Sequence, residues 1–137
     1  MSVLADTHAL HWFLTEPGRL SRAALDRLQE AEFDEASGIA VSVASRIDLY
    51  YLVASGRLDA EVAAQVWAVT TYPDVNVSAV PVSEAIADLF GDSALATLRD
   101  PWDRLIVATA MSLAVPVVTR DSVITKLGSA GVVEVIW

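Results

Sequence analysis

Four aspartates stand where secondary-structure elements are expected to begin or end. Asp6 and Asp121 each follow a short apolar run that is typical of a buried strand. Asp103 falls in the first turn of one expected helix, and Asp48 falls in the second turn of another. Parallel α/β sheets bind ligands beyond the carboxyl ends of their strands. We therefore predict that these four side chains converge at one end of a sheet.

Carboxylates that gather in one place need a counter-charge. Without a counter-ion, repulsion would force at least one of them to take up a proton. A hard divalent cation removes this cost, and Mg²⁺ and Mn²⁺ prefer oxygen ligands. Such a cation activates water and stabilises the leaving oxygen of a phosphodiester. The four aspartates thus predict a Mg²⁺ or Mn²⁺ site suited to phosphodiester hydrolysis.

Each of these acids also has a simpler structural interpretation. Asp103 could pair with Arg104, Asp121 could cap the helix that follows it, and Asp48 could face solvent. Asp6 is harder to explain in this way, because an unpaired charge behind an apolar strand is expensive. Four further residues are auxiliary candidates: Asp100, Thr7, Ser45 and Thr119. We favour a helix cap for Asp100, whereas the three hydroxyls could equally cap local backbone.

Basic and aromatic residues near the acids have two interpretations. Arg46, Arg104 and Arg120 each neighbour a proposed ligand, and could contact phosphate or form ion pairs. His8 and His11 are spaced like a metal pair, but no third nitrogen ligand accompanies them. We interpret both histidines as packing or partner contacts, and the four tryptophans as core or interface residues.

The pattern of apolar runs predicts a three-layer α/β/α fold with a mostly parallel five-stranded sheet in a single domain, residues 1–137. Residues 30–38 are expected to form an acidic loop, and Gly128 is expected to stop a short helix that begins at residue 122. Strands are expected at residues 2–6, 39–42, 75–80, 117–119 and 132–136. Helices are expected at residues 7–14, from Ser21, and at 43–55, 59–71, 83–90, 101–114 and 122–127.

Composition narrows the function classes. The net charge of −9 argues against a simple phosphate-backbone binder but not against a nuclease with metal ions. Hydrophobic residues make up 54% of the chain, yet no apolar run is long enough to span a membrane. We therefore expect that a partner protein or a second copy of the chain covers the excess apolar surface. The chain has no cysteine and no visible secretory signal, and we expect a cytoplasmic protein without membrane contact.

Three segments together resemble the PIN-domain ribonucleases, specifically the VapC-type toxins of toxin–antitoxin pairs. They read LADTHAL at residues 4–10, VASRID at 43–48, and DPWDRLIVA at 100–108 with VTRD at 118–121. The resemblance implies a Mg²⁺- or Mn²⁺-dependent endonuclease that cuts RNA, forms homodimers and is blocked by a cognate antitoxin. It also implies that the metal-binding acids are Asp6, Asp48, Asp103 and Asp121.

One departure from the family pattern leaves an alternative function open. The family usually has Glu where this chain has Asp48, which leaves open a PIN-fold module that binds RNA or protein with weakened or lost catalysis. Other carboxylate enzymes fit poorly. A haloacid dehalogenase-type phosphatase needs an aspartate where His8 stands, and a phospho-receiver domain needs a lysine near the final strands, whereas the only lysine is Lys126.

Overall fold

A five-stranded parallel sheet forms the centre of the molecule. The computed structural model describes residues 1–137. The strand order is β3-β2-β1-β4-β5, and every neighbouring pair is parallel. The strands are β1 (Val3–Ala5), β2 (Ile39–Ser42), β3 (Val77–Val80), β4 (Val117–Val118) and β5 (Val135–Ile136). The predicted three-layer architecture is confirmed, with a sheet that is parallel throughout.

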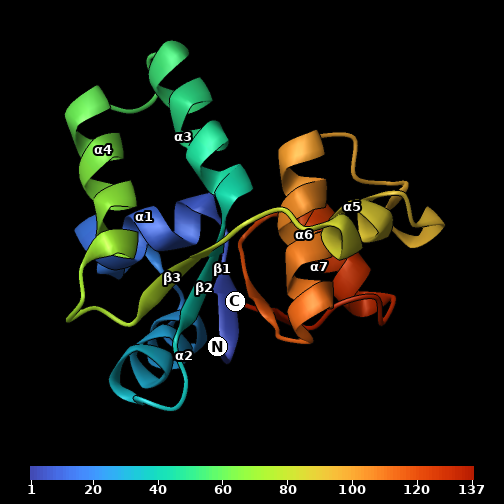
Figure 1. Cartoon of the computed structure of the whole chain (residues 1–137), viewed down its shortest axis with the longest axis horizontal. Coiled ribbons are helices and arrows are strands. Elements are labelled where there is room, and N and C mark those ends of the chain that lie inside the picture. The colour runs from blue at the N-terminus through green and yellow to red at the C-terminus, as the bar shows by residue number, and fades with distance from the viewer.

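The molecule has seven α-helices, and six of them lie on the two sides of the sheet, while α3 continues from the end of β2 (Figure 1). In Figure 1, α1, α2 and α4 lie on one side of it, and α5, α6 and α7 lie on the other. The helices are α1 (Thr7–Thr15), α2 (Arg22–Phe33), α3 (Val43–Ala54), α4 (Ala60–Ala68), α5 (Glu84–Phe90), α6 (Pro101–Leu113) and α7 (Ser122–Ser129). None of them combines the length and hydropathy that a membrane-spanning segment needs.

Alternating strand residues supply the two cores. Val3 and Ala5 of β1 face the cluster that holds α1, α2 and α4, whereas Leu4 faces the cluster that holds α5, α6 and α7. All three are fully buried. Side chains of a strand point alternately to opposite faces, so a strand covered on both sides must be apolar at every position. This is why the strands read as continuous apolar runs.

The structure corrects the expected acidic loop. Helix α2 continues to Phe33, so the first residues of the predicted loop are helical and only residues 34–38 connect α2 to β2. Leu28 and Ala31 are fully buried and three positions apart, so one face of the helix packs on the sheet through this region. The charges of Glu30 and Glu32 therefore belong to the outer part of a helix rather than to a loop.

The expected stop at Gly128 is also wrong. Helix α7 runs through this residue to Ser129. A Cβ atom at position 128 would lie 2.9 Å from Cγ2 of Val135, so glycine is needed there for the close approach of β5. The chain instead reverses at Gly131, whose φ is +76°. The predicted strands at 75–80 and 132–136 are shorter than expected, since pairing begins only at Val77 and Val135.

The sheet changes its winding direction between β1 and β4. From β1 the chain adds β2 and then β3 on one side, and it later returns to place β4 and β5 on the other side. Ala5 at the end of β1 pairs with Val118 at the end of β4. In open α/β sheets this switch point, beyond the carboxyl ends of the two strands, is where ligands bind.

Candidate active site

Asp6 occupies the switch point directly. It follows β1, and only 8% of its surface is exposed. Its Oδ1 atom accepts a hydrogen bond of 2.7 Å from the backbone N–H of Ala9, which caps α1. Its Oδ2 atom accepts a hydrogen bond from the hydroxyl of Thr119, which lies just after β4. The carboxylate is thus held from both of the strands that meet at this point.

Thr119 joins Asp6 to Asp121. Its side chain is fully buried, and its hydroxyl oxygen also accepts a 3.0 Å hydrogen bond from the backbone N–H of Asp121. Thr119 therefore fixes the relation between two candidate acids. Of the three auxiliary hydroxyls, it is the one that contacts a candidate carboxylate.

Thr7 and Ser45 have a different place in the structure. The Thr7 hydroxyl donates a 3.0 Å hydrogen bond to the Ser45 hydroxyl, and both residues are buried. This contact ties the start of α1 to the first turn of α3, the helix that carries Asp48. The pair stabilises the relative position of the two helices.

Asp121 and Asp100 are helix caps, as their structural interpretation predicted. Asp121 Oδ1 accepts from the N–H groups of Val123 and Ile124 at 2.9 and 2.8 Å, at the start of α7. Asp100 Oδ1 accepts from Trp102 at 2.8 Å and from Asp103 at 3.3 Å, at the start of α6. A carboxylate has two oxygens and about four lone-pair positions, so capping through Oδ1 is compatible with a second contact through Oδ2.

Asp103 and Asp48 are half-buried on two helices that meet the same edge of the sheet. Asp103 lies in the first turn of α6, whose far end leads back into β4, so its start lies at the carboxyl edge. Asp48 lies in the second turn of α3, which leaves β2 at that edge. Neither side chain caps its helix. The fold therefore gives these two acids no structural hydrogen bond of the kind that Asp6 and Asp121 have.

The pKa of Asp103 shows that the acids share one electrostatic environment. Its pKa rises from 3.8 to about 7, first because burial disfavours the charged form. Four other carboxylates then add repulsion, and they are the remaining candidates: Asp100, Asp121, Asp48 and Asp6. The structure thus brings the predicted set within electrostatic reach of one point.

Asp6 experiences opposing influences. Burial raises its pKa most strongly, and the charge of Asp121 adds to the rise. The hydrogen bonds from Thr119 and from Ala9 oppose this rise and lower the pKa of Asp6, and so does the electrostatic effect of the nearby His8. Burial is the larger effect, so the net pKa of Asp6 is raised. A nearby positive charge would stabilise its ionised form.

The donor set fits a hard divalent cation. The candidate acids offer only carboxylate oxygen, which suits Mg²⁺ or Mn²⁺ better than softer metals. No three His, Asp or Glu side chains already stand close enough to enclose an ion. Repulsion from the other carboxylates adds to the burial that raises the pKa of Asp103. A cation would relieve the repulsion that the fold imposes on these side chains.

The expected ion pairs with neighbouring arginines do not form. The two ion pairs of the structure join Arg19 to Glu16 and Arg22 to Asp26, so no candidate acid takes part in one. The Arg104 guanidinium instead donates a 3.0 Å hydrogen bond to the carbonyl of Leu98 and lies 5.1 Å from the ring centroid of Phe90. The interpretation of Asp103 as a salt-bridge partner of Arg104 is therefore wrong.

His8 belongs to the candidate site, although its sequence pattern had indicated packing. It is exposed in the first turn of α1, two residues after Asp6. A surface hollow of about 390 Å³ has His8 in its wall, and its lining residues are Asp6, His8, Trp12, Arg120, Asp121 and Ser122. The His8 ring also packs on Trp12, with centroids 5.5 Å apart. The position of His8 in the sequence is the signal that points to the site. A helix that begins where a strand ends places its first turn at the carboxyl edge of the sheet, beside Asp6.

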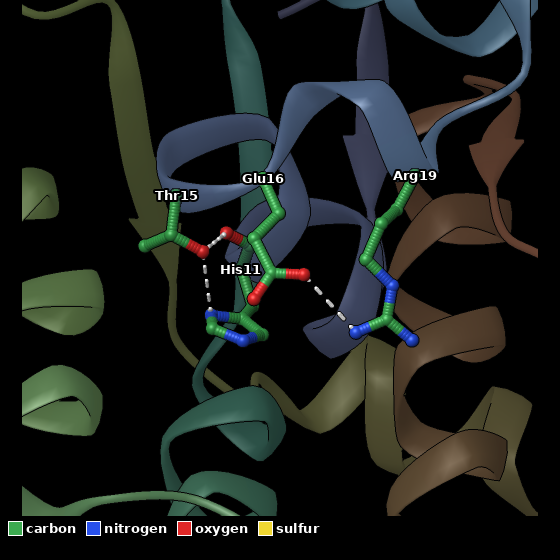
Figure 2. A network of polar contacts seen from close by, with 4 residues as sticks. All are labelled: His11, Thr15, Glu16 and Arg19. Atoms are coloured by element: carbon green, nitrogen blue, oxygen red, sulfur yellow. Dashed lines mark hydrogen bonds and ion pairs between the residues drawn. The ribbon is translucent and has the colours of Figure 1, made fainter.

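His11 lies among local contacts at the far end of α1 (Figure 2). Its Nδ1 atom is 3.2 Å from the Thr15 hydroxyl, which donates a 2.8 Å hydrogen bond to the His11 carbonyl. Glu16 and Arg19 form their ion pair beside it at 3.2 Å. Partial burial lowers the pKa of His11. These local contacts separate His11 from His8, and its predicted packing or partner role stays a prediction.

Comparisons with known proteins agree with the architecture and extend it. Ribonuclease VapC22 of Mycobacterium tuberculosis is 32% identical to this chain over 120 residues, which are 88% of this chain and 87% of that protein. The fold is similar to the solved structure of VapBC2 from Rickettsia felis bound to a promoter DNA fragment, with a TM-score of 0.66, 14% identity and 93% of both chains covered. It is also similar to VapBC-1 from nontypeable Haemophilus influenzae, with a TM-score of 0.64, 15% identity, and 95% of this chain and 94% of that chain covered. Residues 3–129 match the family described as PIN domain. The chain belongs to the PIN-domain family, among the proteins of the VapC type.

Proposed function

We propose that this protein is a metal-dependent endoribonuclease that acts as the toxin of a type II toxin–antitoxin pair in the cytoplasm. The observation that supports this best concerns Asp103, whose pKa rises to about 7. Burial is the main cause of the rise, and Asp100, Asp121, Asp48 and Asp6 all add to it by charge repulsion. The similarity to a protein described as a ribonuclease adds independent support.

In this proposal the four acids hold Mg²⁺ or Mn²⁺. When bound, such a cation would lower the pKa of a water molecule and stabilise the negative charge that develops on the phosphodiester. The protein contributes fixed positions for the ligands. Thr119 and the Ala9 N–H hold the Asp6 carboxylate, and the Asp100 cap fixes the first turn of α6 that carries Asp103. This preorganisation avoids the cost of ordering the ligands when the cation arrives.

RNA cleavage with Mg²⁺ or Mn²⁺ tests the proposal. The wild type is compared with Asp6→Asn and Asp103→Asn, and with Asp74→Asn as a control in the exposed loop before β3. Asparagine keeps an oxygen that can accept the cap hydrogen bond from Ala9, so Asp6→Asn is expected to fold. We expect both site variants to lose cleavage while the control keeps it. Unchanged cleavage in both site variants would contradict the assignment.

A cognate antitoxin and a second copy of the chain are the proposed protein partners. Several solved structures with this fold are described as VapBC toxin–antitoxin complexes. Large apolar side chains also remain more than half exposed in this chain, as partner contacts require: Phe33, Tyr50, Tyr51 and Tyr72. Co-purification with the product of a neighbouring small gene tests the antitoxin, and light scattering of the isolated chain tests the dimer. Failure to co-purify, or a monomer at all concentrations, would contradict the respective part.

One feature favours a second candidate, a module that binds RNA or protein with little catalysis. Asp48 is one methylene shorter than the glutamate expected by resemblance, and it receives no support from a helix cap. Calorimetric titration with Mn²⁺ beside the cleavage assay separates the candidates. An enzyme binds the ion and cuts RNA, whereas a module of this kind cuts RNA weakly or not at all, whether or not it binds the ion.

A further inference from the structure

Arg120 differs from the other two arginines that neighbour candidate acids. It is exposed between Thr119 and Asp121, and it enters neither ion pair of the structure. Arg46 lies over the ring of Trp67, with 5.8 Å between guanidinium and centroid, and Arg104 is held by Leu98 and Phe90. The fold therefore leaves one permanently charged guanidinium beside the carboxylates without a partner.

The hollow beside Asp6 brings acids and cationic or polar groups together. Asp6 and Asp121 line it together with Arg120 and His8, within about 390 Å³. A neutral imidazole keeps one N–H donor in either tautomer, so His8 offers a donor from the α1 side of the hollow. The planar fork of Arg120 matches the geometry of a phosphate group. Groups that bind phosphate and groups that suit a cation thus share one opening.

The negative charge of the chain makes a cationic contact with RNA favourable at this site. The net charge is −9, and five carboxylates surround the site, so a polyanion that approaches this edge is repelled. A positive charge at the rim reduces this repulsion where the RNA strand must enter. We propose that Arg120, assisted by His8 from the α1 side, binds a phosphate of the RNA strand beside the bond to be cut. The proposal rests on the ribonuclease function given above.

RNA binding in a cleavage-deficient background tests this directly. In Asp103→Asn protein with Mg²⁺, fluorescence anisotropy of a labelled mixed-sequence single-stranded RNA gives Kd over a series of salt concentrations. Adding Arg120→Gln is expected to weaken binding about tenfold and to lower the slope of log Kd against log salt by about 0.7, the loss of one phosphate contact. Arg57→Gln removes the same charge from an exposed position beyond α3 and should change neither.

Cleavage kinetics of otherwise wild-type protein give a second reading. Arg120→Gln is expected to raise KM with little effect on kcat, because the contact is equally present before and during the reaction. Arg120→Lys keeps the charge without the fork and should recover part of the affinity. An unchanged Tm in each variant excludes a structural role for this exposed residue.

The outcomes separate the two proposals. If the wild type cuts RNA but Arg120→Gln matches Arg57→Gln in Kd, salt slope and KM, the assignment of Arg120 is overturned and the ribonuclease function stands. If the wild type neither binds nor cuts RNA, both are overturned. A loss confined to kcat would also contradict a binding role for Arg120.

Discussion

Replacing Asp103 by asparagine should stabilise the metal-free protein, although it should destroy the activity. The folded protein raises the pKa of this carboxyl from 3.8 to about 7, chiefly through burial and then through Asp100 and Asp121. Between these two values the folded state holds a proton that the unfolded state has released. The free energy of unfolding of the wild type therefore falls as pH rises through this range, and the full cost is present above about pH 7. Asparagine carries no charge and avoids the cost.

The size of the effect follows from the shift. A difference of about 3 pKa units corresponds to about 4 kcal/mol for a fully shielded group, at 1.36 kcal/mol for each unit. Asp103 is only half-buried, and solvent screening reduces this to about 1–2 kcal/mol. For a domain of this size that free energy raises Tm by roughly 3–8 °C. We expect this gain at about pH 8, expect it to be small near pH 4, and expect it to vanish below about pH 3, where the carboxyl is protonated in both states.

Thermal unfolding in EDTA across this pH range is the measurement. Asp74→Asn is the matched control, because it makes the same chemical change on an exposed loop. Its Tm should follow the wild type at every pH. A Tm difference for Asp103→Asn that stays constant from about pH 4 to pH 8 would refute the electrostatic picture, since the benefit would then not depend on the charge of Asp103.

Three further predictions concern neighbouring parts of the structure. Thr119→Val should lower the free energy of unfolding in urea by about 1–3 kcal/mol, because the buried Asp6 loses a hydrogen-bond donor. Thr119→Ser keeps the hydroxyl and should lower it less. Equal losses in the two variants would contradict this account. Asp48→Glu should increase both Mn²⁺ affinity by calorimetry and the rate of RNA cleavage, and no change in either would show that the shorter side chain does not limit the site. Ala114→Gly should raise stability by about 0.5–1 kcal/mol, because Ala114 ends α6 with a left-handed φ of 53°; a lower Tm would show that this backbone costs nothing.

Local patterns were sufficient to predict the elements that present the acids. Asp100 and Asp121 cap their helices as their positions predicted, because an N-cap bond is made within two or three residues. The apolar runs predicted buried strands because this signal is also local. Successive side chains of a strand point to opposite faces, so a run that is apolar at every position indicates a strand covered on both sides. The errors at residues 30–33 and at Gly128 arose where packing against distant β-strands outweighed the local signal.

The order of residues along the chain is enough to show which of them stand at the ends of strands and helices, and hence which acids could meet. The folded sheet places β1 beside β4, so that the Thr119 hydroxyl reaches Asp6 across a separation of 113 residues. It also decided that Arg104 is held by Leu98 and Phe90 while Arg120 stays without a partner in a hollow shared with Asp6. The physical reason is that periodicity and capping act between near neighbours, whereas burial, charge repulsion and the choice of partner depend on chain segments that only the folded sheet brings together.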